Sequence, residues 1–343
     1  MNDLSDSDEI YSGTIHGHVG ACETGRMDGK RGRFAPSPTG ELHLGNARTA
    51  LLAWLWAKRA GGGFTLRIED LDRPRERPGM AQRQLAELAW LGIDWDEGPD
   101  ARTGADAGAR GPYRQSQRTP LYENALRALG DGVYECFCSR AEIAAAASAP
   151  HGDEGPRYPG TCANLGSAQR SERRRTRVPA LRFRVPEGAV RFEDEIQGPQ
   201  EFDVQTDTGD FVLRRADGIH AYQLAVVVDD AAMGISQVLR GADLLSSTAR
   251  QILLYRALGL AIPSWAHAPL VLSAAGERLA KRDRSVSLDE LRGRNVDPRR
   301  VADELLRLSG QGEAPGQGLA ARARTFALGK VPKSPLALPD LEW

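Results

Sequence analysis

Residues 33–46, RFAPSPTGELHLGN, constrain the fold more than any other part of the sequence. We expect a strand over residues 32–35, a turn imposed by Pro36, Pro38 and Gly40, and a helix that begins at residues 43–45. The helix is predicted from apolar side chains at three- and four-residue spacing, Ala47, Ala50, Leu51, Trp54 and Leu55. Free N–H groups and the positive end of the helix dipole suit phosphates, and glycines let a ligand approach the main chain. This stretch therefore predicts a nucleotide-binding corner.

The tetrad His43-Leu44-Gly45-Asn46 resembles the first signature of class I aminoacyl-tRNA synthetases. The preceding residues 33–40 have the form that glutamyl- and glutaminyl-type enzymes carry, and further motifs recur in order as far as residue 289. Over this range the chain is similar to the family of glutamyl-Q tRNA(Asp) synthetases, which are shortened relatives of glutamyl-tRNA synthetases. The resemblance implies an α/β fold: a Rossmann-type parallel sheet, a zinc-containing insertion, a short helical C-terminal piece and no anticodon-binding domain.

We expect the chain to divide into five parts. Residues 1–30 lack any helical or strand period and predict a disordered extension. The halves of the catalytic domain are expected over 31–130 and 206–270, with the main sheet resuming at 211–214. An insertion over 131–205 contains short alternating segments between 180 and 204 that predict a small β-rich unit. The last part is 271–343.

The composition restricts the class of protein. A net charge of −1 gives no overall attraction to nucleic acid, so any RNA contact must come from local basic patches. No apolar run approaches the ~20 residues of a membrane span, and the N-terminus lacks the pattern of a signal peptide. We therefore expect a cytoplasmic protein without membrane contact, and we expect a monomer.

An acidic cluster at residues 69–72 follows a predicted strand at 64–68. From the residues alone, these carboxylates either cap a helix and pair with Arg73 or Arg75, or they recognise a substrate ammonium group. The resemblance implies the second role, with Glu69 contacting the amino group of the amino acid. It also implies that glutamate is bound by Arg33, Phe34, Ala35, Pro36, Ser37, Glu69, Tyr222 and Arg240. Without the resemblance, Tyr222 is equally well a core tyrosine and Arg240 a partner of Asp243.

Residues 278–282, RLAKR, resemble the second class I signature in a degraded form that keeps Lys281. The resemblance implies that His43, Gly45, Asn46 and Lys281 bind ATP. His43 would hydrogen-bond the phosphates, and Lys281 together with Mg²⁺ would offset the charge that develops on the leaving pyrophosphate. Both are therefore the predicted catalytic residues.

Three of the four cysteines, Cys136, Cys138 and Cys162, fall within one segment. Three thiolates hold Zn²⁺ tetrahedrally when a fourth ligand is supplied. The chemistry of the segment suggests His151 as that ligand, whereas the resemblance implies Tyr158. Four protein ligands leave no open position, so a zinc ion here is expected to be structural.

The predicted reaction is activation of L-glutamate by ATP without tRNA, followed by transfer to the queuosine base at the wobble position of tRNA(Asp). The target is implied by the resemblance, since only a short helical piece at 288–308 follows the second signature. Two alternatives stay open: a glutamyl-tRNA synthetase that charges a tRNA 3′ end, and a non-catalytic relative that binds glutamate or RNA.

Overall fold

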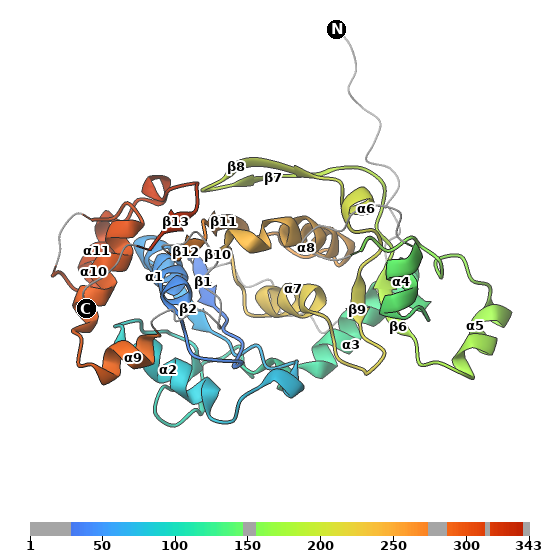
Figure 1. Cartoon of the computed structure of the whole chain (residues 1–343), viewed down its shortest axis with the longest axis horizontal. Helices are drawn as coiled ribbons and strands as arrows, with labels where there is room; N and C mark the ends of the chain where they lie inside the picture. Colours follow the sequence, from blue (N-terminus) through green and yellow to red (C-terminus); the bar gives the residue numbers. More distant parts are fainter. Residues whose placement is uncertain (1–28, 147–155, 274–286, 313–315, 339–343) are drawn as a thin grey trace, which may run out of the picture.

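The computed structural model describes residues 29–146, 156–273, 287–312 and 316–338 (Figure 1). A six-stranded sheet with the order β2-β1-β10-β11-β7-β8 forms its centre. The strands are β2 Gly63–Leu66, β1 Arg31–Phe34, β10 Gln237–Gly241, β11 Ser264–Ala268, β7 Val190–Asp194 and β8 Gly198–Phe202. The first five run parallel to their neighbours, and β8 is antiparallel to β7. The predicted class I parallel sheet is therefore confirmed.

The sheet has a topological switch point between β1 and β10. After β1 the chain passes through helix α1 (Leu44–Arg59) to β2 on one side, while β10 lies on the other side of β1. In open α/β sheets, ligands bind outside the carboxyl ends of the strands at such a point. The ends of β1 and β10 therefore mark where a ligand site belongs.

Helix α1 begins as the sequence predicts. His43 is its N-cap, and the His43 Nδ1 atom accepts a hydrogen bond from the Asn46 N–H at 3.2 Å. A β-carbon on Gly32 would lie only 2.9 Å from the Ala57 Cβ. Glycine at this position therefore lets β1 pack directly against α1, and this contact fixes the helix over the end of the sheet.

The other helices cover the sheet and extend the molecule. Helices α7 and α8 pack against each other, and α10 and α11 pack against α1 (Figure 1). The apolar run that follows residue 221 forms helix α7, which begins at Tyr222. Residues 80–90 have helical spacing and form one helix, and the helical piece predicted at 288–308 is confirmed as two helices separated by residues 294–297. The helices are α2 Met80–Trp90, α3 Thr119–Ala128, α7 Tyr222–Ala232, α8 Leu245–Ala257, α9 Leu288–Gly293, α10 Pro298–Leu308 and α11 Leu319–Thr325.

A second, antiparallel sheet carries the cysteine-bearing part of the chain. It has the order β5-β6-β9, with β5 Val133–Cys136, β6 Ala180–Phe183 and β9 Val212–Arg214. The short helices beside it are α4 Arg140–Ala146, α5 Ser167–Arg174 and α6 Val204–Asp207.

Residues 211–214 do not return to the main sheet as expected, because β9 pairs with β6 instead. The alternating segments between 180 and 204 also divide: β6 joins the small sheet, while β7 extends the main sheet beside β11. Strand pairing is set by distant partners, so short extended segments do not reveal it.

The remaining elements are short. They are the strand pairs β3 Gly98–Pro99 with β4 Asp106–Ala107 and β12 Val271–Leu272 with β13 Leu336–Ala337, and the 3₁₀ turns Arg73–Arg75, Gln115–Gln117, Gly130–Gly132, Ala242–Leu244 and Leu328–Lys330. Among the helices described, none is long and apolar enough to cross a membrane. His151, the signature-like residues 278–282 and residues 1–28 of the predicted extension lie outside the described residues.

Candidate active site

A cavity of about 510 Å³ lies at the carboxyl ends of β1 and β10, where the topology places a ligand site. Its lining includes every described residue predicted to bind glutamate or ATP: Arg33, Phe34, Ala35, Pro36, Ser37, His43, Gly45, Asn46, Glu69, Tyr222 and Arg240. Lys281 lies outside the described residues. One cavity therefore holds both the amino-acid end and the nucleotide end of the predicted site.

Arg33 forms one wall of the amino-acid end. It sits near the end of β1 and is buried, and its Nε lies 3.3 Å from an oxygen of Asp230 on α7. Its Nη1 donates to the Leu239 carbonyl at 3.4 Å. This ion pair bridges β1 and α7, so the guanidinium is held in place before any ligand arrives.

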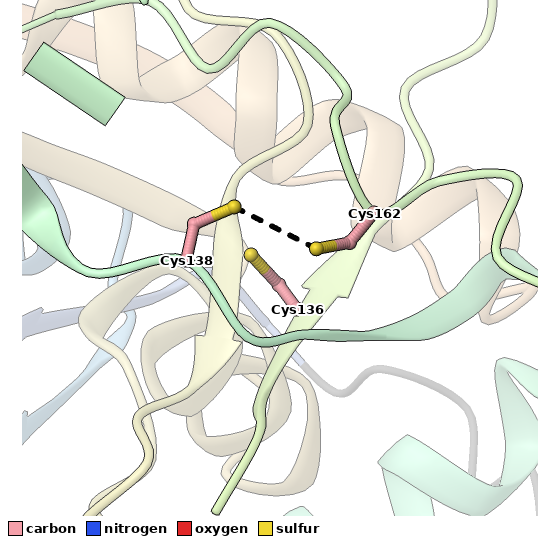
Figure 2. A group of neighbouring side chains, drawn as sticks. All are labelled: Cys136, Cys138 and Cys162. Atoms are coloured by element: carbon pink, nitrogen blue, oxygen red, sulfur yellow. Dashed lines mark hydrogen bonds between the residues drawn. The ribbon is translucent and has the colours of Figure 1, made fainter. Parts of the chain in front are cut away.

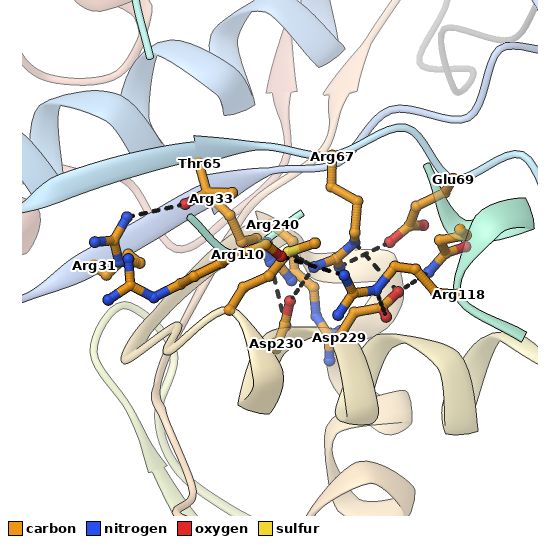
Figure 3. A network of polar contacts seen from close by, with 12 residues as sticks. Arg31, Arg33, Thr65, Arg67, Glu69, Arg110, Arg118, Asp229, Asp230 and Arg240 are labelled. Atoms are coloured by element: carbon orange, nitrogen blue, oxygen red, sulfur yellow. Dashed lines mark hydrogen bonds and ion pairs between the residues drawn. The ribbon is translucent and has the colours of Figure 1, made fainter. Parts of the chain in front are cut away.

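Arg67, just beyond β2, links the same helix to Glu69. It is fully buried and donates to Asp230 at 2.7 Å and to Glu69 at 3.1 Å (Figure 3). The neighbouring Asp229 is matched by Arg118 at 2.5 Å. The backbone of Glu69 also contacts the turn that precedes the first signature, because its N–H donates to the Pro36 carbonyl at 3.0 Å. Burial raises the pKa of the Glu69 carboxyl above its ordinary value, although Arg67 and Arg33 oppose this shift.

Arg240, at the end of β10, is a buried cation with a different environment. Within the described part of the chain its direct hydrogen-bond partners are all neutral: Tyr222, Leu244, Thr248, Gln251 and His267. The pairing with Asp243 that the sequence left open is not among them. Burial lowers the pKa of Arg240, as expected for a cation without an acid in contact.

The charged groups at the sheet edge of the cavity have an excess of one positive charge. The cations of this cluster are Arg33, Arg67, Arg118 and Arg240, and its anions are Glu69, Asp229 and Asp230. Two further carboxylates line the cavity: Glu41, which pairs with Arg83 at 3.1 Å, and the exposed Asp243. Such a wall favours a small ligand with a net charge of −1 that also carries a cation for Glu69.

The nucleotide end is built on the N-terminus of α1. The ring of His43 is so close to Gly45 that a β-carbon there would lie 3.0 Å from the ring. The histidine therefore folds back over the helix start, where N–H groups and the helix dipole suit an anion. The chain returns to this point after residues 274–286, since the Leu288 N–H donates to the Leu42 carbonyl at 3.1 Å.

Helix α2 holds the loop that leads into the signature. Gln84 is buried, and its Nε2 donates to the carbonyls of Ser37 at 3.0 Å and Gly40 at 2.6 Å. Glu87 accepts from the Leu42 N–H at 3.0 Å. Burial raises the pKa of Glu87 to about 7. Two side chains of one helix thus fix the backbone on either side of the turn.

The three clustered cysteines meet in space as the sequence predicts (Figure 2). Their sulfur atoms all lie within 4.8 Å of one another, and Cys138 Sγ is 3.6 Å from Cys162 Sγ. The Tyr158 hydroxyl lies 3.4 Å from Cys136 Sγ, and Arg182 stacks over the Tyr158 ring at 3.8 Å. Burial raises the pKa of the Cys136 thiol, but hydrogen bonds from Tyr158 and Arg182 leave it below its ordinary value. This donor set fits a divalent metal ion of the zinc type.

Several residues of the site had no role assigned from the sequence. Asp230 and Gln84 hold Arg33 and the signature loop, and His267 and Asp194 lie behind Arg240. Of these four, only Asp230 could have been found from the sequence. Asp229 and Asp230 directly follow an apolar run, and two carboxylates that are buried need cationic partners. The other three act through contacts between distant segments, which no local pattern reveals.

Known proteins share this architecture. The family model of tRNA synthetases class I (E and Q), catalytic domain, matches residues 31–323. The chain is 52% identical to a glutamyl-Q tRNA(Asp) synthetase of Symbiobacterium thermophilum, over 90% of this chain and 95% of that protein. It is 50% identical to one of Nitratidesulfovibrio vulgaris, over 82% and 86%.

A crystal structure of glutamate–tRNA synthetase from Elizabethkingia anophelis matches with a TM-score of 0.78 at 29% identity, over 91% of this chain and 68% of that chain. The fold, residues 33–46 and the sequence matches all indicate the same family. The chain therefore belongs to the class I tRNA synthetases of the E and Q type, a family of ligases.

Proposed function

We propose that this enzyme activates L-glutamate with ATP, without needing tRNA, and transfers the glutamate to the queuosine base at the wobble position of tRNA(Asp). The observation that carries the choice of amino acid is the charge at the amino-acid end of the cavity, where four arginines meet three carboxylates and Arg240 has no acid in contact among the described residues. Glutamate has a net charge of −1 and an ammonium group, and it complements this end of the cavity. Glutamine is neutral overall and does not.

The two arginines serve the substrate side chain. During activation an oxygen of the α-carboxylate attacks the α-phosphorus of ATP, and pyrophosphate leaves, so that carboxylate must stay free and near the nucleotide end. Arg33 and Arg240 therefore bind the side-chain carboxylate, and Glu69 binds the ammonium group. Tyr222 accepts a hydrogen bond from Arg240 at 3.3 Å and lines the same pocket. Residues 34–37 line the cavity between its amino-acid end and its nucleotide end, and we assign them to the glutamate site as well.

The nucleotide end supplies charge neutralisation rather than a covalent group. His43, Gly45 and Asn46 present the start of α1 to the ATP phosphates. We assign Lys281, with Mg²⁺ on the pyrophosphate, to the leaving group. Its assignment is supported by its flanks: Val271 lines the cavity, and Ser287 forms a bridge with His43.

The second step joins the activated carbonyl carbon to a hydroxyl of the modified base, and AMP leaves. The choice of tRNA(Asp) is supported by the matches to glutamyl-Q tRNA(Asp) synthetases, to which the chain is 52% and 50% identical. The proposal includes a monomer that acts in the cytoplasm and holds one structural Zn²⁺ through Cys136, Cys138, Tyr158 and Cys162.

The test is transfer of labelled glutamate, with ATP and Mg²⁺, to tRNA from cells that make queuosine and from cells that do not. Label only on queuosine-containing tRNA(Asp), and surviving removal of the 3′-terminal adenosine, is the expected result. Label on tRNA(Glu) that is lost with that adenosine would instead establish an aminoacylating enzyme. Pyrophosphate exchange with glutamate alone tests the tRNA-independent step.

Lys281→Ala is expected to abolish this exchange while the enzyme stays folded. The matched control is Arg191→Gln, which alters an exposed side chain of β7 that pairs with Glu201 at 2.9 Å. Near-normal exchange in Lys281→Ala would remove the lysine from the mechanism.

A further inference from the structure

Three neighbouring strands place a row of side chains behind the amino-acid pocket. Asp194 ends β7, His267 lies in β11 and Arg240 lies in β10. The parallel register pairs Arg240 with His267 directly and Asp194 with Trp265, two residues before His267. The three side chains therefore follow one another across β7, β11 and β10 toward the cavity.

Continuous hydrogen bonds join this row. His267 Nδ1 lies 2.6 Å from an oxygen of Asp194, and Arg240 Nε lies 3.0 Å from His267 Nε2. All three side chains are buried. Of the three, only Arg240 lines the cavity.

The chemistry of the row permits only one protonation pattern. The guanidinium Nε carries a hydrogen and is a donor, so His267 Nε2 must accept. His267 Nδ1 must then carry the ring proton, which it donates to Asp194. Asp194 must remain an ionised acceptor. Its other oxygen accepts hydrogen bonds from the N–H groups of Ile196 at 3.0 Å, Gln197 at 2.8 Å and His267 at 3.1 Å.

We propose that Asp194 and His267 are positioning residues that orient the Arg240 guanidinium toward the side-chain carboxylate of the amino-acid substrate. Asp194 fixes the tautomer of His267, and His267 fixes the Nε edge of Arg240. This inference rests on the proposed function, because the residue that Asp194 and His267 orient belongs to the proposed glutamate pocket.

A neutral partner also preserves the charge that the substrate needs. A carboxylate directly on Nε would form an ion pair with Arg240, as Asp230 does with Arg33 at 3.3 Å. Here the acid lies on the far side of the imidazole ring, so the hydrogen-bond partners of the guanidinium among the described residues are all neutral. The row thus gives Arg240 a fixed direction without an acid in contact with it.

Asp194→Asn tests the tautomer directly. The retained amide oxygen keeps the three backbone donors, so the NH₂ group faces His267 Nδ1 and moves the ring proton to Nε2, against the Arg240 N–H. We expect the KM for glutamate and the calorimetric Kd for glutamate to rise about 10- to 100-fold. The KM for ATP and the melting temperature are expected to change little.

A pair of neutral variants separates positioning from packing. His267→Gln places an acceptor where Nε2 stood, whereas His267→Asn does not reach Arg240. We expect Gln to retain most of the glutamate affinity and Asn to lose about as much as Asp194→Asn. Because glutamine has no tautomer, adding Asp194→Asn to His267→Gln is expected to cost little more.

Equal glutamate affinities in His267→Gln and His267→Asn would overturn the proposal, even if Asp194→Asn failed to fold. A parallel rise in the KM values for glutamate and ATP would also overturn it, since that marks a general structural role. Arg191→Gln is the control on the same strand as Asp194. If the wild-type protein binds glutamate but does not modify queuosine-containing tRNA, only the proposed function is refuted. If the wild type modifies that tRNA and the His267→Gln and His267→Asn variants bind glutamate equally well, only this inference is refuted.

Discussion

At the scale of single residues, the two arginines of the pocket differ in what they contact. Arg33 is ion-paired with Asp230, whereas Arg240 contacts neutral groups. Removing Arg240 therefore strands no acid within the described part of the chain, and the fold should tolerate the change better than most losses of a buried charge. This makes Arg240 the better position at which to test charge recognition without unfolding the enzyme.

Arg240→Gln is expected to lower kcat/KM for glutamate about 100-fold, because two charge-assisted hydrogen bonds worth roughly 3 kcal/mol together are lost. Activity with glutamine should fall less, so the preference for glutamate narrows. ATP–pyrophosphate exchange with each amino acid measures both effects, and Arg191→Gln controls for loss of an arginine. An equal decrease for glutamine would show that Arg240 does not read the side-chain charge.

His267 predicts how stability depends on pH. Burial lowers its pKa from about 6.5 to about 4. As the pH falls below 6.5 the unfolded chain therefore binds the proton first, and the free energy of unfolding decreases until about pH 4. At pH 5 the loss from this residue is about 2 kcal/mol. Urea unfolding at pH 7.5 and pH 5 should show a smaller difference for His267→Gln than for wild type, and identical differences would refute the prediction.

At the scale of elements, α2 acts as a support for the loop that precedes the signature. Gln84 alone bonds two carbonyls of that loop, those of Ser37 and Gly40. Gln82 lies on the same helix but bonds the carbonyl of Ala101, away from the loop. The helix thus offers two glutamines with the same chemistry and different targets.

Gln84→Ala is expected to raise the KM for ATP about tenfold with a much smaller change in the KM for glutamate, because the loop before His43 loosens. The enzyme should also lose about 2 kcal/mol of stability, one for each hydrogen bond. Exchange kinetics and urea unfolding measure the two effects. Gln82→Ala serves as the control, and a similar rise in its KM for ATP would remove the special role of Gln84.

Elements with strong local signals could be predicted from the sequence. Residues 80–90 have helical spacing and form α2, and the strand and helix around the first signature lie where expected, because helical spacing and turn residues are local properties. Strand β9 could not be assigned to its sheet, since its pairing with β6 depends on a segment 30 residues away. His267 escaped notice for the same reason: its importance comes from its register neighbour on β10.

At the scale of the whole molecule, the cysteine-bearing part and the C-terminal helices lie at opposite ends of the main sheet (Figure 1). The cysteine-bearing part has its own small core, formed by Tyr134, Cys136, Phe137, Ile143, Tyr158 and Cys162. None of these residues lines the cavity. So small an apolar cluster supplies little stability alone, which is the situation in which proteins use a structural metal.

Removing the proposed zinc ion should therefore separate the two steps of the proposed reaction. Cys138→Ser, or treatment with a chelator, is expected to loosen the segment of β5, β6 and α4, so that limited proteolysis cuts there first. Glutamate-dependent pyrophosphate exchange should stay within about twofold of the untreated enzyme, since the cavity has its own supports, while transfer to tRNA falls about tenfold or more. Metal content by mass spectrometry should drop by one zinc per chain, and adding zinc to the chelated enzyme should restore transfer. If exchange and transfer decline together, the metal supports the whole fold rather than one end of it.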